Sequence, residues 1–104
     1  MASMRAKLSP GRYKLQGEPD YAEHPGVLLG EELEARGMTR AALARETNLR
    51  PAVIAEIVRG KRPITPDFAV ELEAALGASA RFWLNLQTTY DLVESRRRRL
   101  ERSA

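Results

Sequence analysis

Basic side chains gather in the middle of this 104-residue chain and again at its C-terminus. Between Met38 and Pro63, six basic residues stand against two acidic ones, a net charge of +4. The following segment, 64–95, carries −4, and residues 96–104 carry +4. A basic centre beside an acidic flank can hold a polyanion against one face of a protein. Scattered, solvated charges would give the same totals, so charge alone leaves both interpretations open.

The residue types that catalysis or metal binding requires do not come together in this sequence. His24 is the only histidine and cysteine is absent, which excludes disulfides, cysteine–zinc sites and thiol chemistry. The acids around Glu31 and Asp67 are better explained as solvated helix residues that complement helix dipoles. No glycine-rich phosphate loop or nucleophile motif is present. We therefore predict a protein that is not an enzyme and has no metal or cofactor, in which His24 caps or packs at a helix start.

Helical periods begin at residue 25. Residues 1–24 show no sustained apolar period and are expected to form an extended or disordered N-terminal arm. Residues 25–104 predict one compact all-α domain of five helices, over about 26–36, 40–47, 51–59, 66–76 and 80–99. No apolar run approaches the roughly 20 residues of a membrane span, and no signal peptide is visible. We expect a cytoplasmic bacterial protein without a membrane partner.

The second and third predicted helices have the pattern of a helix-turn-helix. Inward-facing residues are Leu43, Ala44, Leu49, Ile54 and Ile57. Asn48 is expected to take a left-handed conformation in the turn between the two helices. The outward face of the third helix is then free to enter a DNA major groove. A plain helical hairpin inside a bundle would show the same pattern.

Three motifs frame this region. They are His24-Pro25-Gly26, the stretch Arg59-Gly60-Lys61-Arg62-Pro63-Ile64-Thr65, and Phe82-Trp83-Leu84-Asn85-Leu86-Gln87 followed by Tyr90-Asp91-Leu92. Over about residues 24–95, the chain resembles HigA-type antitoxins, which belong to the XRE (phage-repressor-like) helix-turn-helix class. The resemblance implies a lambda-repressor-like five-helix domain, a homodimer and repression of its own operon by binding operator DNA. It also implies neutralisation of a HigB toxin, a RelE-like endoribonuclease.

The resemblance places the groove-facing positions on the third helix. They are Arg50, Pro51, Ala52, Val53, Ala55 and Glu56. The predicted DNA-binding residues, counting base and phosphate contacts together, are Arg40, Arg50, Ala52, Val53, Glu56, Arg59, Lys61 and Arg62. Ala52 and Val53 can touch thymine methyl groups, and Glu56 can accept from cytosine N4. Because so few of these side chains read base edges, we expect binding to depend on phosphate contacts and DNA shape.

Two other functions remain open. A protein-binding antitoxin or adaptor with weak or no DNA binding would explain the apolar third helix, and the acidic helix 26–36 and the arm would then contact a basic toxin. A solitary XRE-family transcriptional regulator would need no toxin. Trp83, Leu86 and Tyr90 are predicted dimer contacts, with core packing an equal alternative. The run Arg96–Arg99 is expected to be a solvated helix end, with DNA phosphate contact the alternative.

Overall fold

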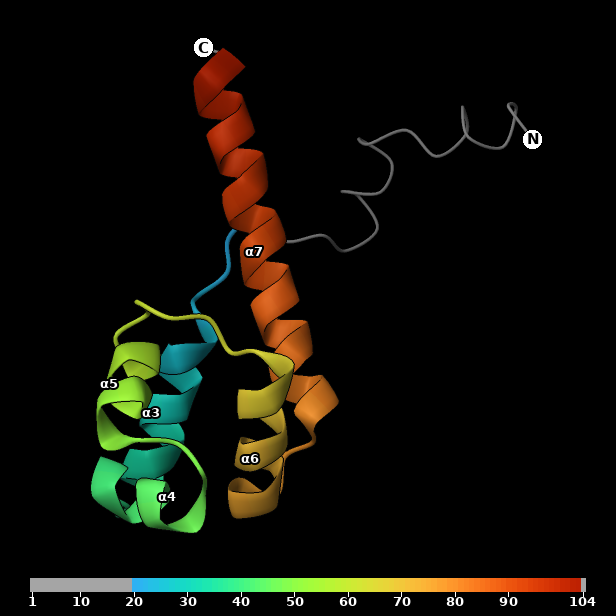
Figure 1. Ribbon diagram of the computed structural model, residues 1–104. Coiled ribbons are helices and arrows are strands. Elements are labelled where there is room, and N and C mark those ends of the chain that lie inside the picture. Colours follow the sequence, from blue (N-terminus) through green and yellow to red (C-terminus); the bar gives the residue numbers. More distant parts are fainter. Residues whose placement is uncertain (1–19, 104) are drawn as a thin grey trace, which may run out of the picture.

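The computed structural model describes residues 20–103, which form five helices and no strand (Figure 1). The helices are α3 (Pro25–Ala35), α4 (Arg40–Glu46), α5 (Pro51–Val58), α6 (Pro66–Leu76) and α7 (Ala80–Ser103). The all-α prediction is confirmed, and the first four helices lie within one residue of their predicted ends. The fifth continues past its predicted end at Arg99 to Ser103. Most of the predicted arm, residues 1–19, lies outside the described residues.

Side-chain caps explain where several helices begin. The Thr39 hydroxyl accepts a hydrogen bond from the Ala42 N–H (3.0 Å), and the Ser79 hydroxyl accepts one from the Phe82 N–H (3.0 Å). Such caps satisfy backbone N–H groups that have no partner within the helix. Gly37, which follows α3, takes the left-handed conformation that ends many helices, with φ of 61°. The caps therefore set helix boundaries that the sequence already indicates.

The turn between α4 and α5 differs from its predicted conformation. No residue other than glycine has a positive φ within residues 20–103, so the left-handed Asn48 is wrong. The Asn48 backbone N–H donates to Glu71 Oε1 (3.1 Å), and its side-chain Nδ2 donates to Glu71 Oε2 (3.3 Å). An acceptor on α6 thus holds this turn, and the backbone needs no strained residue.

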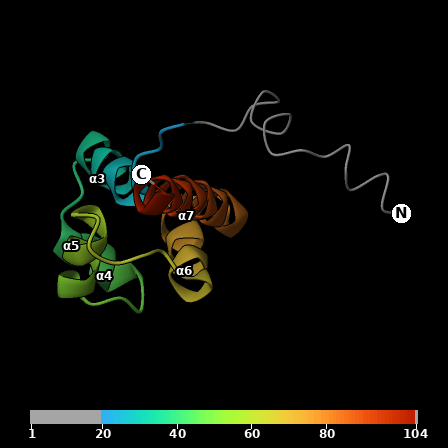
Figure 2. The ribbon, with the colours of Figure 1, turned by 90° about the horizontal axis from the view of Figure 1, so that it is seen from above.

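The core forms where all five helices meet. Figure 2, seen from above, places α6 against α7 and the helices α3, α4 and α5 to one side. The large side chains that are fully buried in the core are Leu29, Leu43, Ile54, Ile57, Ile64, Leu72 and Trp83. The dimer contact predicted for Trp83 is wrong, because a side chain with 0% exposure has no surface left for a partner. Leu86 packs partly buried against this core, and Tyr90 is partly buried beside it.

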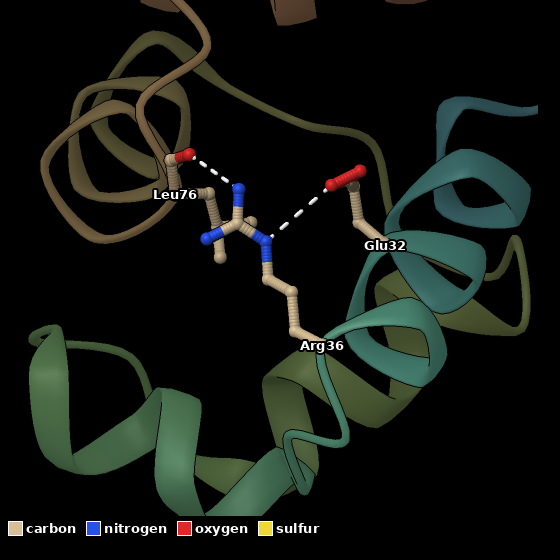
Figure 3. A network of polar contacts seen from close by, with 3 residues as sticks. All are labelled: Glu32, Arg36 and Leu76. Atoms are coloured by element: carbon tan, nitrogen blue, oxygen red, sulfur yellow. Dashed lines mark hydrogen bonds and ion pairs between the residues drawn. The ribbon is translucent and has the colours of Figure 1, made fainter.

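A polar contact joins the ends of α3 and α6. Arg36 reaches from the end of α3 to donate from Nη2 to the Leu76 carbonyl (2.7 Å), with Nε 3.4 Å from Glu32 Oε1 (Figure 3). The last carbonyl groups of a helix lack partners within the helix, so a cation here stabilises the end of α6.

At the other side of the molecule, the C-terminal part of α7 extends beyond the other helices (Figure 1). No helix of residues 20–103 is long and apolar enough to cross a membrane.

Candidate DNA-binding surface

Buried residues hold α4 and α5 in place from behind. Leu43 of α4 and Ile54 and Ile57 of α5 are fully buried, and Leu49 in the turn is 8% exposed. Ala44 packs partly buried against the same core. The predicted inward face of the helix-turn-helix is therefore confirmed.

The outward face of α5 is narrower than predicted. Ala52 is exposed, Val53 is partly buried against the core, and Ala55 is buried at 8% exposure. The groove-facing position predicted for Ala55 is therefore wrong, because the wide stripe that buries Ile54 also covers the small residue next to it. Pro51 and Ala52, in the first turn of α5, remain open to a partner.

Exposed cations lie at the start of α4 and at both ends of α5. Four of the predicted phosphate-binding residues are exposed and have no ion pair within residues 20–103: Arg40, Arg50, Arg59 and Lys61. Arg40 begins α4, Arg50 precedes α5, and the other two follow α5. Arginine and lysine in such positions can bind phosphate oxygens on both sides of an inserted helix.

Arg62 differs from these four cations because its side chain forms an ion pair with Glu56. Both its Nε and its Nη2 lie 2.8 Å from Oε1 of Glu56, and the two side chains are 42% and 44% exposed. Two nitrogens on one edge of the guanidinium therefore meet the same carboxylate oxygen, which orients that edge toward Glu56. Glu56 and Arg62 were predicted as separate DNA contacts, and the structure brings them together as one pair.

His24 joins the start of α3 to the segment that follows α5. Its Nδ1 accepts from the Gly26 N–H (2.9 Å), which confirms the predicted cap. Its ring meets that of Tyr90 edge-on, with centroids 5.1 Å apart. Burial lowers the pKa of His24 below 6.5, opposed by a hydrogen bond to the Arg62 backbone and by the charge of Asp91. The histidine therefore acts as a packing and capping residue at a junction of three segments.

Gln87 is a positioning residue that the sequence analysis did not single out. Its side chain is 6% exposed, its Oε1 accepts from the Ile64 N–H (2.8 Å), and its Nε2 donates to Asp91 (2.9 Å). A buried N–H must find an acceptor, and Gln87 supplies it from another helix. The sequence feature that could have identified Gln87 as a buried residue is its position four residues after Trp83, on the buried face of α7.

The close packing of α3 on α5 depends on a glycine. A Cβ atom on Gly26 would overlap the backbone carbonyl of Ile57. The motif His24-Pro25-Gly26 therefore combines a cap, a favourable first helical residue and a contact point between two backbones.

A groove follows the outer face of α3. It has a volume of about 620 Å³ and its lining includes Val27, Glu31, Glu34, Met38 and Val58. Val27 is 38% exposed, and both glutamates are exposed. The groove therefore combines apolar walls with two carboxylates, and Arg40 also lines it. The two carboxylates suit a partner with basic side chains.

Comparison with known proteins agrees with this architecture. A helix-turn-helix family model matches residues 29–83. The virulence-associated protein I of Dichelobacter nodosus is 47% identical over 72 residues, covering 68% of this chain and 67% of its own length. Antitoxin HigA-1 of Vibrio cholerae is 36% identical over 72 residues, covering 69% and 68%. The solved structure of Pseudomonas aeruginosa antitoxin HigA with the higBA promoter matches with a TM-score of 0.74 at 34% identity, covering 79% of this chain and 90% of that one.

The fold and the comparisons together define a class of protein. This chain belongs to the XRE-type helix-turn-helix family, and its relatives within that family include the HigA antitoxins. The resemblance seen in the motifs at residues 24–26, 59–65 and 82–87 is thereby confirmed.

Proposed function

We propose that this protein binds the operator DNA of its own operon through α4 and α5, and so represses transcription in the bacterial cytoplasm. The observation that carries the proposal is the set of exposed, unpaired cations at the ends of α4 and α5, on a helix-turn-helix whose inner face is packed into the core. Such a surface can place α5 in a major groove while its flanks bind phosphates. The promoter complex of a similar antitoxin supports the same use of this fold. A homodimer would present two such surfaces to two half-sites.

Most of the binding free energy would come from the phosphate contacts. The side chains expected to make them are Arg40, Arg50, Arg59 and Lys61. The exposed first turn of α5 would add apolar contacts from Ala52, and Val53 would add less because it is partly buried. Such binding weakens steeply with salt, since each phosphate contact releases condensed counterions.

The test is a salt titration of binding to the DNA immediately upstream of the reading frame, compared with a scrambled duplex of equal length. Replacing all four cations by alanine should reduce the slope of log K against log salt by about 0.9 for each lost contact. Arg81→Ala is the control, because this exposed arginine lies at the start of α7, away from α4 and α5. An unchanged slope in the fourfold variant would contradict the proposed surface.

We also propose that the groove on α3 binds and neutralises a toxin of the HigB type, a basic RelE-like endoribonuclease. Its support is the pair of exposed carboxylates, Glu31 and Glu34, beside apolar walls, two acidic groups against the one cation, Arg40, that also lines the groove. Co-expression with the product of the neighbouring reading frame should give a stable complex, which the double variant Glu31→Lys, Glu34→Lys loses while retaining DNA binding. If the wild-type chain captures no such product but binds upstream DNA, the protein is a solitary regulator.

A second candidate function rests on the outward face of α5. Because that helix offers few hydrogen-bonding side chains, a protein-binding antitoxin with weak DNA binding also fits the surface. Equal affinities for the upstream and scrambled duplexes, together with tight toxin binding, would favour this candidate.

A further inference from the structure

Glu56 is unusual on α5 because every other side chain of that helix is apolar. Among the residues Pro51–Val58, only Glu56 carries a group that can form hydrogen bonds. A carboxylate at a DNA-binding surface is repelled by phosphates unless it is neutralised. Here Arg62 neutralises it through two contacts of 2.8 Å to one oxygen, Oε1. The DNA-facing side of α5 therefore presents an ion pair.

An ion pair and a bond made by a nearby residue position Arg62. Its side chain is bound to Glu56. Two residues further on, the Ile64 N–H is bound to buried Gln87. The side chains of the neighbouring cations Arg59 and Lys61 have no ion-pair partner among the described residues. An arginine that is already ordered loses less side-chain entropy when it binds, which favours a contact of defined geometry.

The free edge of Arg62 has the geometry of a guanine-binding group. Its Nε and one Nη2 hydrogen face Glu56, so both Nη1 hydrogens and the second Nη2 hydrogen remain available. These donors match O6 and N7 of guanine in the major groove. Glu56, whose Oε1 receives both contacts, orients this edge of the guanidinium toward the base.

We propose that Arg62, held in position by Glu56, reads one G·C base pair in each DNA half-site, in place of the base-reading side chains that α5 lacks. Arg62 is the specificity-determining residue, and Glu56 is the positioning residue that orients it. This inference rests on the proposed DNA binding and adds that the binding is sequence-selective at one defined position.

The test is a base-substitution scan. Each base pair of the upstream site located by footprinting is replaced in turn, and the affinity of each duplex is measured for wild type, Arg62→Ala and Arg62→Lys. At one G·C pair per half-site, substitution should weaken wild-type binding by about 5- to 100-fold and leave Arg62→Ala nearly unaffected. Arg62→Lys should keep the salt dependence but lose this discrimination, because lysine cannot bind O6 and N7 with the same fork. Arg59→Ala serves as the matched control and should weaken all duplexes equally.

Glu56→Gln tests the positioning role. It should lower discrimination at the same base pair as Arg62→Ala, and the double variant should lose no more than Arg62→Ala alone, since the two residues act as one unit. A uniform loss of affinity for every duplex in Arg62→Ala would identify a phosphate contact and overturn the inference. If the wild-type chain binds no upstream duplex more tightly than a scrambled one, the proposed operator binding fails first, and the inference fails with it.

Discussion

Two turns flank α5, and they are held in different ways. The turn before α5 is joined to α6 only by exposed bonds, since Asn48 donates to Glu71 at 3.1 and 3.3 Å. Part-buried bonds within the turn add to these, because the Thr47 hydroxyl donates to the Leu43 carbonyl (2.9 Å) and accepts from the Leu49 N–H (3.2 Å). The turn after α5 is joined to α7 by a buried bond from the Ile64 N–H to Gln87. Water can replace Glu71 as the partner of Asn48, but it cannot replace Gln87 as the partner of the Ile64 N–H.

The difference indicates which side of α5 is rigid. The two Asn48 bonds contribute little because water can replace Glu71, so the attachment of this turn to α6 is the weaker of the two. A buried N–H without a partner is costly, so the turn after α5 keeps one conformation. The segment that carries Arg62 is therefore held more firmly than the turn before α5. Four substitutions test this difference between the two turns.

Gly26→Ala should have the largest effect. Its Cβ would overlap the Ile57 carbonyl, so α3 must move away from α5 and carry His24 with it. We expect a loss of about 3 kcal/mol in the free energy of unfolding, measured by urea denaturation. The control is Gly30→Ala, whose Cβ would lie 3.2 Å from a side-chain methyl of Val58 and which gains helix propensity. Equal stabilities of the two variants would refute the close contact.

Gln87→Met tests the buried turn directly. Methionine has a similar volume but leaves the Ile64 N–H without an acceptor, so stability should fall by about 1–3 kcal/mol. Amide hydrogen exchange at Ile64 should become much faster than in the wild type. Asn85→Met, at an exposed position of α7, should change neither quantity. A protected Ile64 amide in Gln87→Met would show that another group holds this turn.

Glu71→Ala tests the exposed turn. Both Asn48 bonds are lost, but water can satisfy the freed groups, so the expected cost is about 0.5–1 kcal/mol. The matched control is Glu31→Ala, an exposed glutamate whose side chain makes no hydrogen bond in the part of the chain that the structure describes. A cost as large as that of Gln87→Met would remove the contrast between the two turns.

The smallest expected effect is a pH dependence at the second turn. Burial lowers the pKa of His24 below 6.5, so in the range between its folded pKa and 6.5 the unfolded chain binds more protons than the folded one. The contribution is fully present above pH 6.5 and is lost as pH falls through the folded pKa. Urea midpoints at several pH values should fall more for wild type than for His24→Asn, which keeps a capping side chain. Parallel pH curves for the two proteins would exclude His24 as the cause.

The sequence predicted what local order controls. The helix boundaries followed from apolar periods and from caps such as Thr39 and Ser79, because these signals act within a few residues. The inward positions Leu43, Ile54 and Ile57 followed from the same periods. The motifs at residues 24–26, 59–65 and 82–87 indicated the family, although the physical role of each motif residue was not visible.

Only the tertiary structure decided which distant groups meet. Trp83 was left between core and dimer contact, and its complete burial assigns it to the core. Asn48 needed no left-handed backbone because Glu71, 23 residues away, supplies its acceptor. Glu56 and Arg62 became one ion pair, and the segment that carries Arg62 is tied to α7 through the bond from the Ile64 N–H to Gln87. Periodicity specifies which face of a helix is buried, but the partner of a polar group depends on how the helices pack, and that packing sets the geometry of the surface offered to DNA.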